Sequence, residues 1–261
     1  MTGTLDHIVI NTVTKMDDAA ALFEALGFNL TPRGYHSLGS LNHLMMTRGA
    51  YLELVGVPPT GLQRADVLES PPGLNGLVLK SVDADGTYRD LASLGLEPSH
   101  PVGFSRPVTI DGAEAMARFR IVRLPSAMFP AGRVYFCEHL TPDYVWRPEW
   151  FDHPNGFLGF GTLTVDTPDM ARDIGLYAKV CDRPAMPLEN GARLAIDGCT
   201  IDLITGAKAS FRAITLVFDE LDVIRMRASA QPDLVWKDWP DGSTTLDIPS
   251  LHVTLHCRRA S

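Results

Sequence analysis

Residues 5–26, LDHIVINTVTKMDDAAALFEAL, carry the pattern that decides the fold. The apolar positions of residues 5–11 predict a short strand, and the apolar spacing of residues 16–26 predicts an amphipathic helix of about three turns. Short strands are then expected wherever apolar and aromatic side chains cluster, at residues 28–31, 41–47 and 51–55. The first unit therefore has the order strand, helix and three strands.

The same order recurs along the rest of the chain, and a repeat of this kind determines the architecture. Each later unit opens with a strand and a helix, at residues 74–83 and 86–94, 161–166 and 168–178, and 213–218 and 221–228. Each closes with short strands, at residues 116–124 and 134–140, 192–196 and 200–205, and 244–248 and 252–257. The chain is predicted to be an α+β protein of four tandem βαβββ modules.

Composition excludes several classes of protein. Apolar residues make up 45% of the chain and charged residues 21%, which is typical of a globular protein. The net charge of −8, without a basic cluster, argues against a nucleic-acid partner. No apolar run approaches the roughly 18 residues of a membrane span, so we expect a cytoplasmic protein without a membrane partner. The four cysteines contain no CxxC pair and are expected to be reduced, mostly buried thiols.

Three motifs resemble a known superfamily. LDHIVI at residues 5–10, ALFEALGF at 21–28 and YLELVGV at 51–57 are similar to the module pattern of the vicinal oxygen chelate proteins, also called the glyoxalase/bleomycin resistance/dioxygenase superfamily. Residues 135–156, YFCEHLTPDYVWRPEWFDHPNG, resemble a signature of its glyoxalase-like branch. The resemblance is strong over residues 5–156 and weaker beyond.

This resemblance implies that two modules pair their curled sheets into a half-barrel cup around a divalent metal. Four modules then form two cups. We expect a first domain at residues 1–156 that contains the metal cup, and a degenerate second domain at residues 157–261.

The resemblance also implies metal ligands on the first and last strand of each module. Because alternate side chains of a strand share a face, His7 is expected to face the cup together with Leu5 and Val9. By the same rule Glu53 faces the cup. On the corresponding strand of the second module Glu138 and His139 point to opposite faces, and matching against Glu53 selects Glu138. The predicted metal ligands are therefore His7, Glu53 and Glu138, and the fourth position falls on Gly76.

One imidazole and two carboxylates suit Mn, Fe, Ni, Co or Zn, and the missing fourth ligand leaves the open position that a Lewis-acid catalyst needs. Glu53 is the most informative residue of the three, because burying a carboxylate in the apolar strand YLELV costs several kcal/mol unless it is protonated, paired or bound to a cation. The alternative to a metal is a salt bridge from Glu53 to Arg118 or Arg120.

Candidate substrate-binding residues are Arg118, Arg120 and His43. The two arginines share one face of the strand MARFRIV, where they either clamp a carboxylate or phosphate or lie on a solvated outer face. His43 is placed near the cup by its position in LNHLMMT. Trp146 and Trp150 are expected to fill an apolar seam between the two halves of the chain, with ligand binding as the alternative.

The second cup has a poor set of ligands. Strand alternation places Thr162, Asp202, Ala213 and Thr254 at the ligand positions, and only Asp202 can bind a metal. We expect this half to be a packing partner or a pocket without metal.

Two classes of function follow. The first is a metal-dependent lyase or isomerase in which Glu138 or Glu53 moves a proton beside the carbonyl of a small vicinal-oxygen compound. The second is a metal-free protein that binds or sequesters a small molecule in the cup. Either class acts on a small molecule and is expected to be a monomer or a homodimer, since two cups already lie in one chain.

Overall fold

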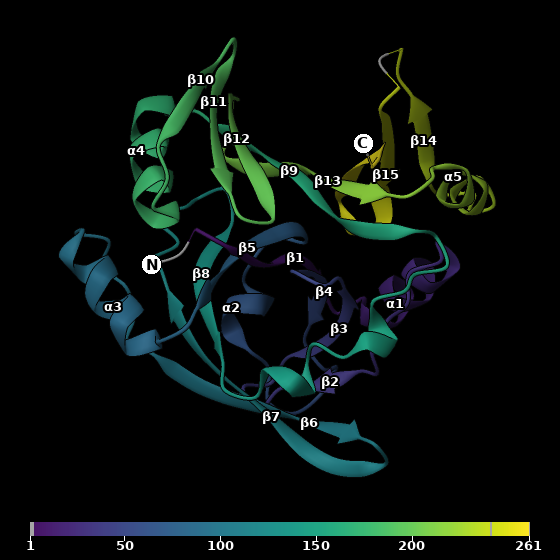
Figure 1. Cartoon of the computed structure of the whole chain (residues 1–261), viewed down its shortest axis with the longest axis horizontal. Coiled ribbons are helices and arrows are strands. Elements are labelled where there is room, and N and C mark those ends of the chain that lie inside the picture. The colour runs from purple at the N-terminus through teal and green to yellow at the C-terminus, as the bar shows by residue number, and fades with distance from the viewer. Residues whose placement is uncertain (1–2, 241, 261) are drawn as a thin grey trace.

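The computed structural model describes residues 3–240 and 242–260. In this part of the chain the strands form two eight-stranded sheets (Figure 1). The strand order of the first is β2-β3-β4-β1-β5-β8-β7-β6, and the second has the same order with every strand number raised by eight. The fold of four modules in two similar halves is therefore confirmed.

Each module contains one long helix between its first and second strands. The first module consists of β1 (Leu5–Val13), α1 (Met16–Ala25), β2 (Gly34–Tyr35), β3 (Leu41–Met46) and β4 (Tyr51–Gly56). The second consists of β5 (Gly73–Ser81), α3 (Ala84–Ser93), β6 (Val102–Ile110), β7 (Ala113–Arg123) and β8 (Arg133–His139). The third consists of β9 (Phe157–Thr167), α4 (Met170–Cys181), β10 (Ala185–Leu188), β11 (Gly191–Ile196) and β12 (Cys199–Thr205). The fourth consists of β13 (Ser210–Phe218), α5 (Asp222–Ser229), β14 (Val235–Asp238), β15 (Thr244–Ile248) and β16 (Val253–Arg259).

Short helices occupy the connections between these strands. They are α2 (Ala65–Leu68), η1 (Pro142–Tyr144), η2 (Pro148–Trp150) and η3 (Pro249–Leu251). Among the described residues, no helix is both long and apolar enough to cross a membrane.

The second strand of each module was the hardest to predict. The strand expected at residues 28–31 is wrong, because Thr31 binds Leu44 on β3 through only two hydrogen bonds, at 2.9 and 3.0 Å, before Pro32 interrupts the pairing. The strands β6, β10 and β14 were missed. All three are outermost strands of their sheets, and β6 and β10 also contain a proline, so their apolar patterns are weak.

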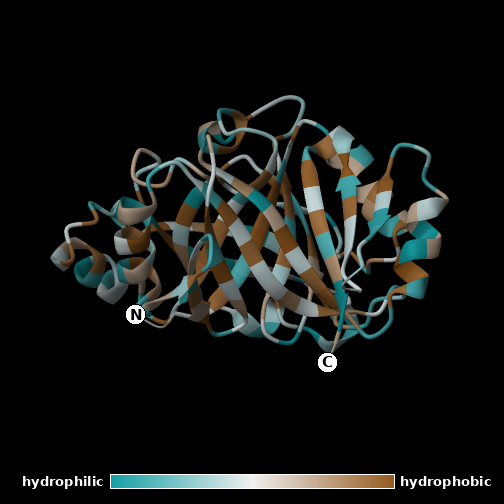
Figure 2. Cartoon of the chain, turned by 90° about the horizontal axis from the view of Figure 1, so that it is seen from above, coloured by the Kyte–Doolittle hydropathy of each residue, from teal (hydrophilic) through white to brown (hydrophobic). Residues whose placement is uncertain are grey.

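The two faces of the first sheet pack into different clusters. The face that carries Ile8, Ile10, Leu52 and Leu54 belongs to a large core that also includes residues of the second sheet. The opposite, concave face has a cluster of its own, in which Val9, Tyr51, Val55, Val78, Phe119, Tyr135 and Cys137 take part. Figure 2 shows apolar residues gathered along the strands at the middle of the molecule.

The connector after β8 closes the concave face of the first sheet. Trp146, Trp150 and Phe151 pack against the concave-face cluster, and Trp146 lies 5.7 Å from Tyr51 between ring centroids. The expectation that these tryptophans fill the seam between the halves is wrong. That seam is formed instead by Phe28, Phe157 and Phe218, whose rings contact one another.

The expected domain boundary after residue 156 coincides with the start of β9 at Phe157. Since both sheets contribute to one large core, the division of the chain into two separately folding domains stays a prediction. All four cysteines are free and buried, as expected.

Candidate functional site

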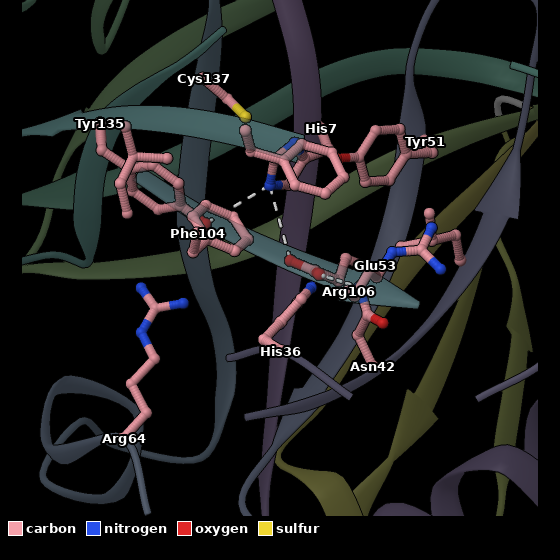
Figure 3. A pocket seen from close by; sticks show the side chains of 13 residues that line it. His7, His36, Asn42, Tyr51, Glu53, Arg64, Phe104, Arg106, Tyr135 and Cys137 are labelled. Atoms are coloured by element: carbon pink, nitrogen blue, oxygen red, sulfur yellow. Dashed lines mark hydrogen bonds and ion pairs between the residues drawn. The ribbon is translucent and has the colours of Figure 1, made fainter. Parts of the chain in front are cut away.

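A small cavity lies inside the concave face of the first sheet (Figure 3). We call it the inner cavity. Its free volume of about 30 Å³ holds one or two water molecules. Its wall combines aromatic, basic and acidic side chains: His7, His36, Asn42, Leu44, Tyr51, Glu53, Arg64, Phe104, Arg106, Phe119, Ile121, Tyr135 and Cys137.

His7 faces this cavity, as predicted, but a β-bulge changes the face of its neighbours. In the pairing of β1 with β5, Leu5 opposes Leu79 and His7 opposes Val78, so Asp6 is an extra residue. Leu5 consequently packs with Ile8 in the large core, and the expectation that Leu5 shares the face of His7 is wrong.

The bulge brings Asp6 and His7 into contact. The Asp6 Oδ1 atom lies 2.6 Å from His7 Nδ1 and 3.2 Å from His139 Nε2. Complete burial alone would raise the pKa of Asp6, but the charge and hydrogen bonds of His139 and His7 outweigh it and hold this pKa well below its usual range. An ionised Asp6 accepts the Nδ1 proton of His7, which leaves the Nε2 lone pair free to face the cavity.

Glu53 also faces the cavity from β4, as strand alternation predicted. Its Oε2 atom lies 3.5 Å from His7 Nε2, and its Oε1 atom accepts a hydrogen bond of 2.7 Å from Asn42 Nδ2. The side chain is buried, with 6% of the residue exposed. The hydrogen bond from Asn42 compensates part of this burial, and the alternative of a salt bridge to Arg118 or Arg120 is wrong.

Glu138 does not reach the cavity, so the predicted trio of His7, Glu53 and Glu138 is not assembled. The Glu138 Oε2 atom accepts a hydrogen bond of 3.1 Å from Ala84 N at the start of α3 and lies 3.6 Å from Arg120 Nη1. A carboxylate at a helix N-terminus stabilises the helix, which is a structural role. The residues of β8 that face the cup are instead Tyr135, Cys137 and His139.

Strand register identifies the residue that corresponds to Glu53 in the second module. On β1, Val9 lies two residues after His7 and pairs with Glu53 on β4. On β5, Val78 lies two residues after Gly76 and pairs with Tyr135 on β8. Because Gly76 corresponds to His7, Tyr135 corresponds to Glu53. Its Oη atom lies 3.4 Å from His7 Nε2. Burial, followed by the charge of Glu53, raises the pKa of Tyr135, so it is a neutral phenol.

Gly76 occupies the position that would carry a second imidazole. A Cβ atom built there would lie 2.6 Å from Val9 Cγ2 and 2.7 Å from Val9 Cβ. Val9 therefore fills the space that a ligand on β5 would need.

The three predicted substrate-binding residues lie outside the inner cavity. Arg120 donates two hydrogen bonds of 2.8 Å to Asp85, and Arg118 is exposed on the same outer face of β7. His43 lies on the helix-facing side of β3, where Nδ1 contacts Thr31 O at 2.8 Å and Nε2 accepts from Arg33 at 3.2 Å. Their assignment to substrate binding is wrong for this cavity.

The cavity wall also contains three basic residues, of which sequence reasoning missed Arg64 and Arg106. Arg64 forms a two-pronged ion pair with Asp66 at 2.7 and 2.8 Å. His36 contacts Ser40 Oγ at 2.8 Å. Burial, and to a smaller extent the charges of Arg106 and Arg64, lower the pKa of His36 well below its usual value. Arg106 lies on β6, whose alternation of Phe104, Arg106 and Val108 is a signal that Pro107 obscured.

A second group of possible metal ligands adjoins the cavity. One ligand atom each from Asp6, Cys137 and His139 lies within 4.8 Å of the others. Burial, followed by the charges of Asp6 and Glu53, raises the pKa of Cys137 far above its usual value, which keeps the thiol protonated. A metal bound there would have to displace that proton.

In the second half, Asp202 is already paired. Arg193 on β11 donates two hydrogen bonds of 2.6 Å to its carboxylate, and Thr162 is hydrogen-bonded to Thr200 at 2.9 Å. These contacts give both side chains a structural role.

Paired βαβββ modules whose concave sheet carries a histidine and a glutamate on adjacent strands define a protein of the vicinal oxygen chelate superfamily. The chain belongs to the glyoxalase-like domain family, whose model matches residues 5–181. No curated protein matches it.

Solved structures share the fold at low sequence identity. A hypothetical protein from Staphylococcus aureus superposes with a TM-score of 0.72 at 13% identity, covering 98% of this chain and 99% of its own. A mutant of 4-hydroxymandelate synthase from Streptomyces coelicolor has a TM-score of 0.59 at 10% identity, with 99% and 93% coverage. The halotolerant catechol dioxygenase BphC has a TM-score of 0.55 at 14% identity, with 100% and 87% coverage.

Proposed function

We propose that this chain is a divalent-metal-dependent lyase or isomerase of the glyoxalase type, which moves a proton beside the carbonyl of a small vicinal-oxygen compound. The observation that carries the proposal is the pair His7 and Glu53, whose facing atoms lie 3.5 Å apart in a buried cavity. The similarity to a dioxygenase fold supports a metal site in this sheet but does not decide the reaction.

The residues present fit a metal ion. Two ligands of one tetrahedral ion, each at about 2.1 Å, lie about 3.4 Å apart, close to the observed separation of His7 Nε2 and Glu53 Oε2. The contact from Asp6 to His7 Nδ1 is the outer hydrogen bond typical of a metal-binding histidine. His7 and Glu53 would hold the ion, and an imidazole with a carboxylate suits Mn, Fe, Ni, Co or Zn.

When bound, the ion would polarise the substrate carbonyl and so acidify the neighbouring C–H bond. Glu53 takes the released proton, and Asn42 orients its carboxylate through the 2.7 Å hydrogen bond. Tyr135 is a neutral phenol in the same wall, so it donates a hydrogen bond to the oxygen that gains negative charge. Trp146 and its neighbours in the connector keep water out of the concave face.

The competing function is a metal-free binding protein. Its specific support is the presence of Arg64 and Arg106 in the cavity wall, because guanidinium groups disfavour a second cation nearby. The pair of Arg64 with Asp66 reduces this effect.

Metal binding separates the two functions. The protein is purified without chelator, its metal content is measured by elemental analysis, and Mn²⁺ and Zn²⁺ are titrated into His7→Gln, Glu53→Gln and Glu138→Gln variants. We expect about one ion per chain in the wild type and in Glu138→Gln, and at least tenfold weaker binding in the other two variants. Equal binding by all four proteins would overturn the assignment of the ligands.

A proton-transfer assay tests the reaction class. Hydroxyacetone, a small carbonyl compound with adjacent oxygens, is incubated in D₂O with the metal-loaded protein, and hydrogen exchange is followed by NMR. We expect faster exchange with the wild type and a loss of about 100-fold or more in Glu53→Gln. Metal binding without any acceleration would argue against a proton-transfer enzyme.

A further inference from the structure

Arg106 is a buried cation whose charge is not paired. Only 5% of the residue is exposed, yet among residues 3–240 and 242–260 its side chain forms no hydrogen bond and no ion pair. Burial lowers its pKa, while Tyr51 and Glu53 act in the opposite direction, and a guanidinium remains charged. A buried charge without a partner is costly, so its position needs an explanation.

Two cavities meet at this side chain. Arg106 lines the inner cavity together with His7 and Glu53, as Figure 3 shows. It also lines a second, more open pocket of about 240 Å³. We call this the outer pocket, and its wall is formed by Thr31, Pro32, Arg33, Arg106, Pro107, Val108, Thr109, Ile110, Glu114, Tyr144, Val145, Arg147 and Trp150.

The other cations of these walls are neutralised. Arg33 is paired with Asp17 at 2.6 Å, and Arg64 is held by Asp66. Arg147 is paired with Asp111 at 2.8 Å and with Glu149. Arg106 is therefore the cation that remains for an anion entering from outside.

A glycine on the neighbouring strand makes room for the Arg106 side chain. Gly34 on β2 faces it, and a Cβ atom there would lie 2.9 Å from Arg106 Cδ and 2.2 Å from Asn42 Oδ1. The glycine thus leaves room for Arg106 beside the residue that orients Glu53.

We infer that the outer pocket binds a small monocarboxylic acid whose carboxylate pairs with Arg106. The guanidinium geometry matches a carboxylate through two parallel hydrogen bonds. The apolar wall of Pro107, Val108, Val145 and Trp150 suits a hydrophobic or aromatic body. This inference deepens the proposed function and rests on it only for the reaction: Arg106 would hold the acid so that its carbonyl end enters the inner cavity beside His7 and Glu53.

The test compares an acid with its uncharged isostere. Binding of phenylacetate and of phenylacetamide is measured by calorimetry on the full chain, both as purified and after chelator treatment. The variants are Arg106→Gln, Arg106→Lys and, as a matched control, Arg118→Gln on the outer face of the neighbouring strand. A Zn²⁺ titration of each variant is recorded in parallel.

We expect the wild type to bind phenylacetate at least tenfold more tightly than phenylacetamide. Arg106→Gln should abolish this preference, Arg106→Lys should keep part of it, and Arg118→Gln should keep all of it. If Arg106→Gln does not fold, the preference of the wild type and its partial retention in Arg106→Lys carry the test, together with a decrease of the preference at high salt.

Three results would overturn the inference: equal binding of acid and amide, an unchanged preference in Arg106→Gln, or no binding of the acid at millimolar concentration.

A failure of the proposed function would give different results from a failure of the acid pocket. If Zn²⁺ does not bind but the preference for the acid depends on Arg106, the acid pocket stands and the metal enzyme is excluded. If Zn²⁺ binds at His7 and Glu53 without any preference for the acid, the reverse holds.

Discussion

The carboxylate of Asp6 contacts the imidazole of His7 at 2.6 Å, although the two residues are consecutive in a strand. The β-bulge in the pairing of β1 with β5 turns both side chains toward the cup. This contact places the ring proton of His7 on Nδ1, so the Nε2 atom that faces Glu53 carries a lone pair. Asp6 is therefore part of the site.

Replacing Asp6 with Asn should weaken metal binding without removing a ligand. The variant keeps an acceptor for His7 but loses the charge that makes the imidazole a better donor, so we expect a loss of about 10- to 100-fold in Mn²⁺ or Zn²⁺ affinity. The control is Asp85→Asn, at a carboxylate that pairs with Arg120 outside the cup. An unchanged affinity in Asp6→Asn would mean that the contact is only structural.

Most of the fold could be predicted from local pattern. The alternation within LDHIVI and YLELV correctly placed His7 and Glu53 on one face, because the pairing of β1 with β4 is regular from His7 onward. The outermost strands escaped prediction because their residues are half-exposed and carry little apolar signal.

The rest of the site depends on pairing between strands. Alternation along β8 separates Glu138 from His139 but does not say which of them faces the cup; the register with β5 decides this and places Tyr135 opposite Val78. The bulge at Asp6 likewise exists only in the pairing with β5. Arg106 was missed because Pro107 beside it weakens the strand pattern of β6.

Gly76→Ala should destabilise the protein. Its new Cβ atom would lie 2.6 Å from Val9 Cγ2 inside a packed sheet, and overpacking of this kind costs about 1 to 3 kcal/mol in the free energy of unfolding. The control is Gly159→Ala on β9, where a Cβ atom would meet nothing within 4 Å. That substitution should be neutral or stabilising by up to about 1 kcal/mol. Urea unfolding of both variants gives the comparison, and equal stabilities would show that Val9 can move aside.

Asp66→Asn should lower stability in a pH-dependent way. Burial raises the pKa of Asp66, but the hydrogen bond and charge of Arg64, with Arg123 and Arg133, lower it from 3.8 to about 2. Because the folded state holds the proton less tightly than the unfolded state, the stabilisation is fully present above about pH 4 and is lost as the pH falls toward 2.

Removing this carboxylate leaves Arg64 buried without its ion pair. We expect the free energy of unfolding to fall by about 2 kcal/mol at pH 7. This is less than for a fully buried pair, because the Asp66 side chain is 35% exposed. Urea unfolding between pH 3 and 7 should show the difference from the wild type shrinking with acid. The exposed Asp143→Asn serves as control, and a difference that stays constant with pH would contradict the pairing of Asp66 with Arg64.

Tyr135→Phe should separate hydrogen bonding from metal binding. The phenol occupies the position that corresponds to Glu53, and its Oη atom lies 3.4 Å from His7 Nε2. Since burial raises its pKa, it stays protonated and is a poor ligand compared with a carboxylate. We therefore expect the Zn²⁺ affinity to stay within about threefold of the wild type. The exchange of hydroxyacetone hydrogens in D₂O should slow by about 100-fold, as is typical when one donor to a developing negative oxygen is removed.

Tyr144→Phe, in the outer pocket, is the control and should change neither quantity. A loss of Zn²⁺ affinity as large as that of His7→Gln would show instead that the phenol is a third ligand, and the site would then consist of His7, Glu53 and Tyr135.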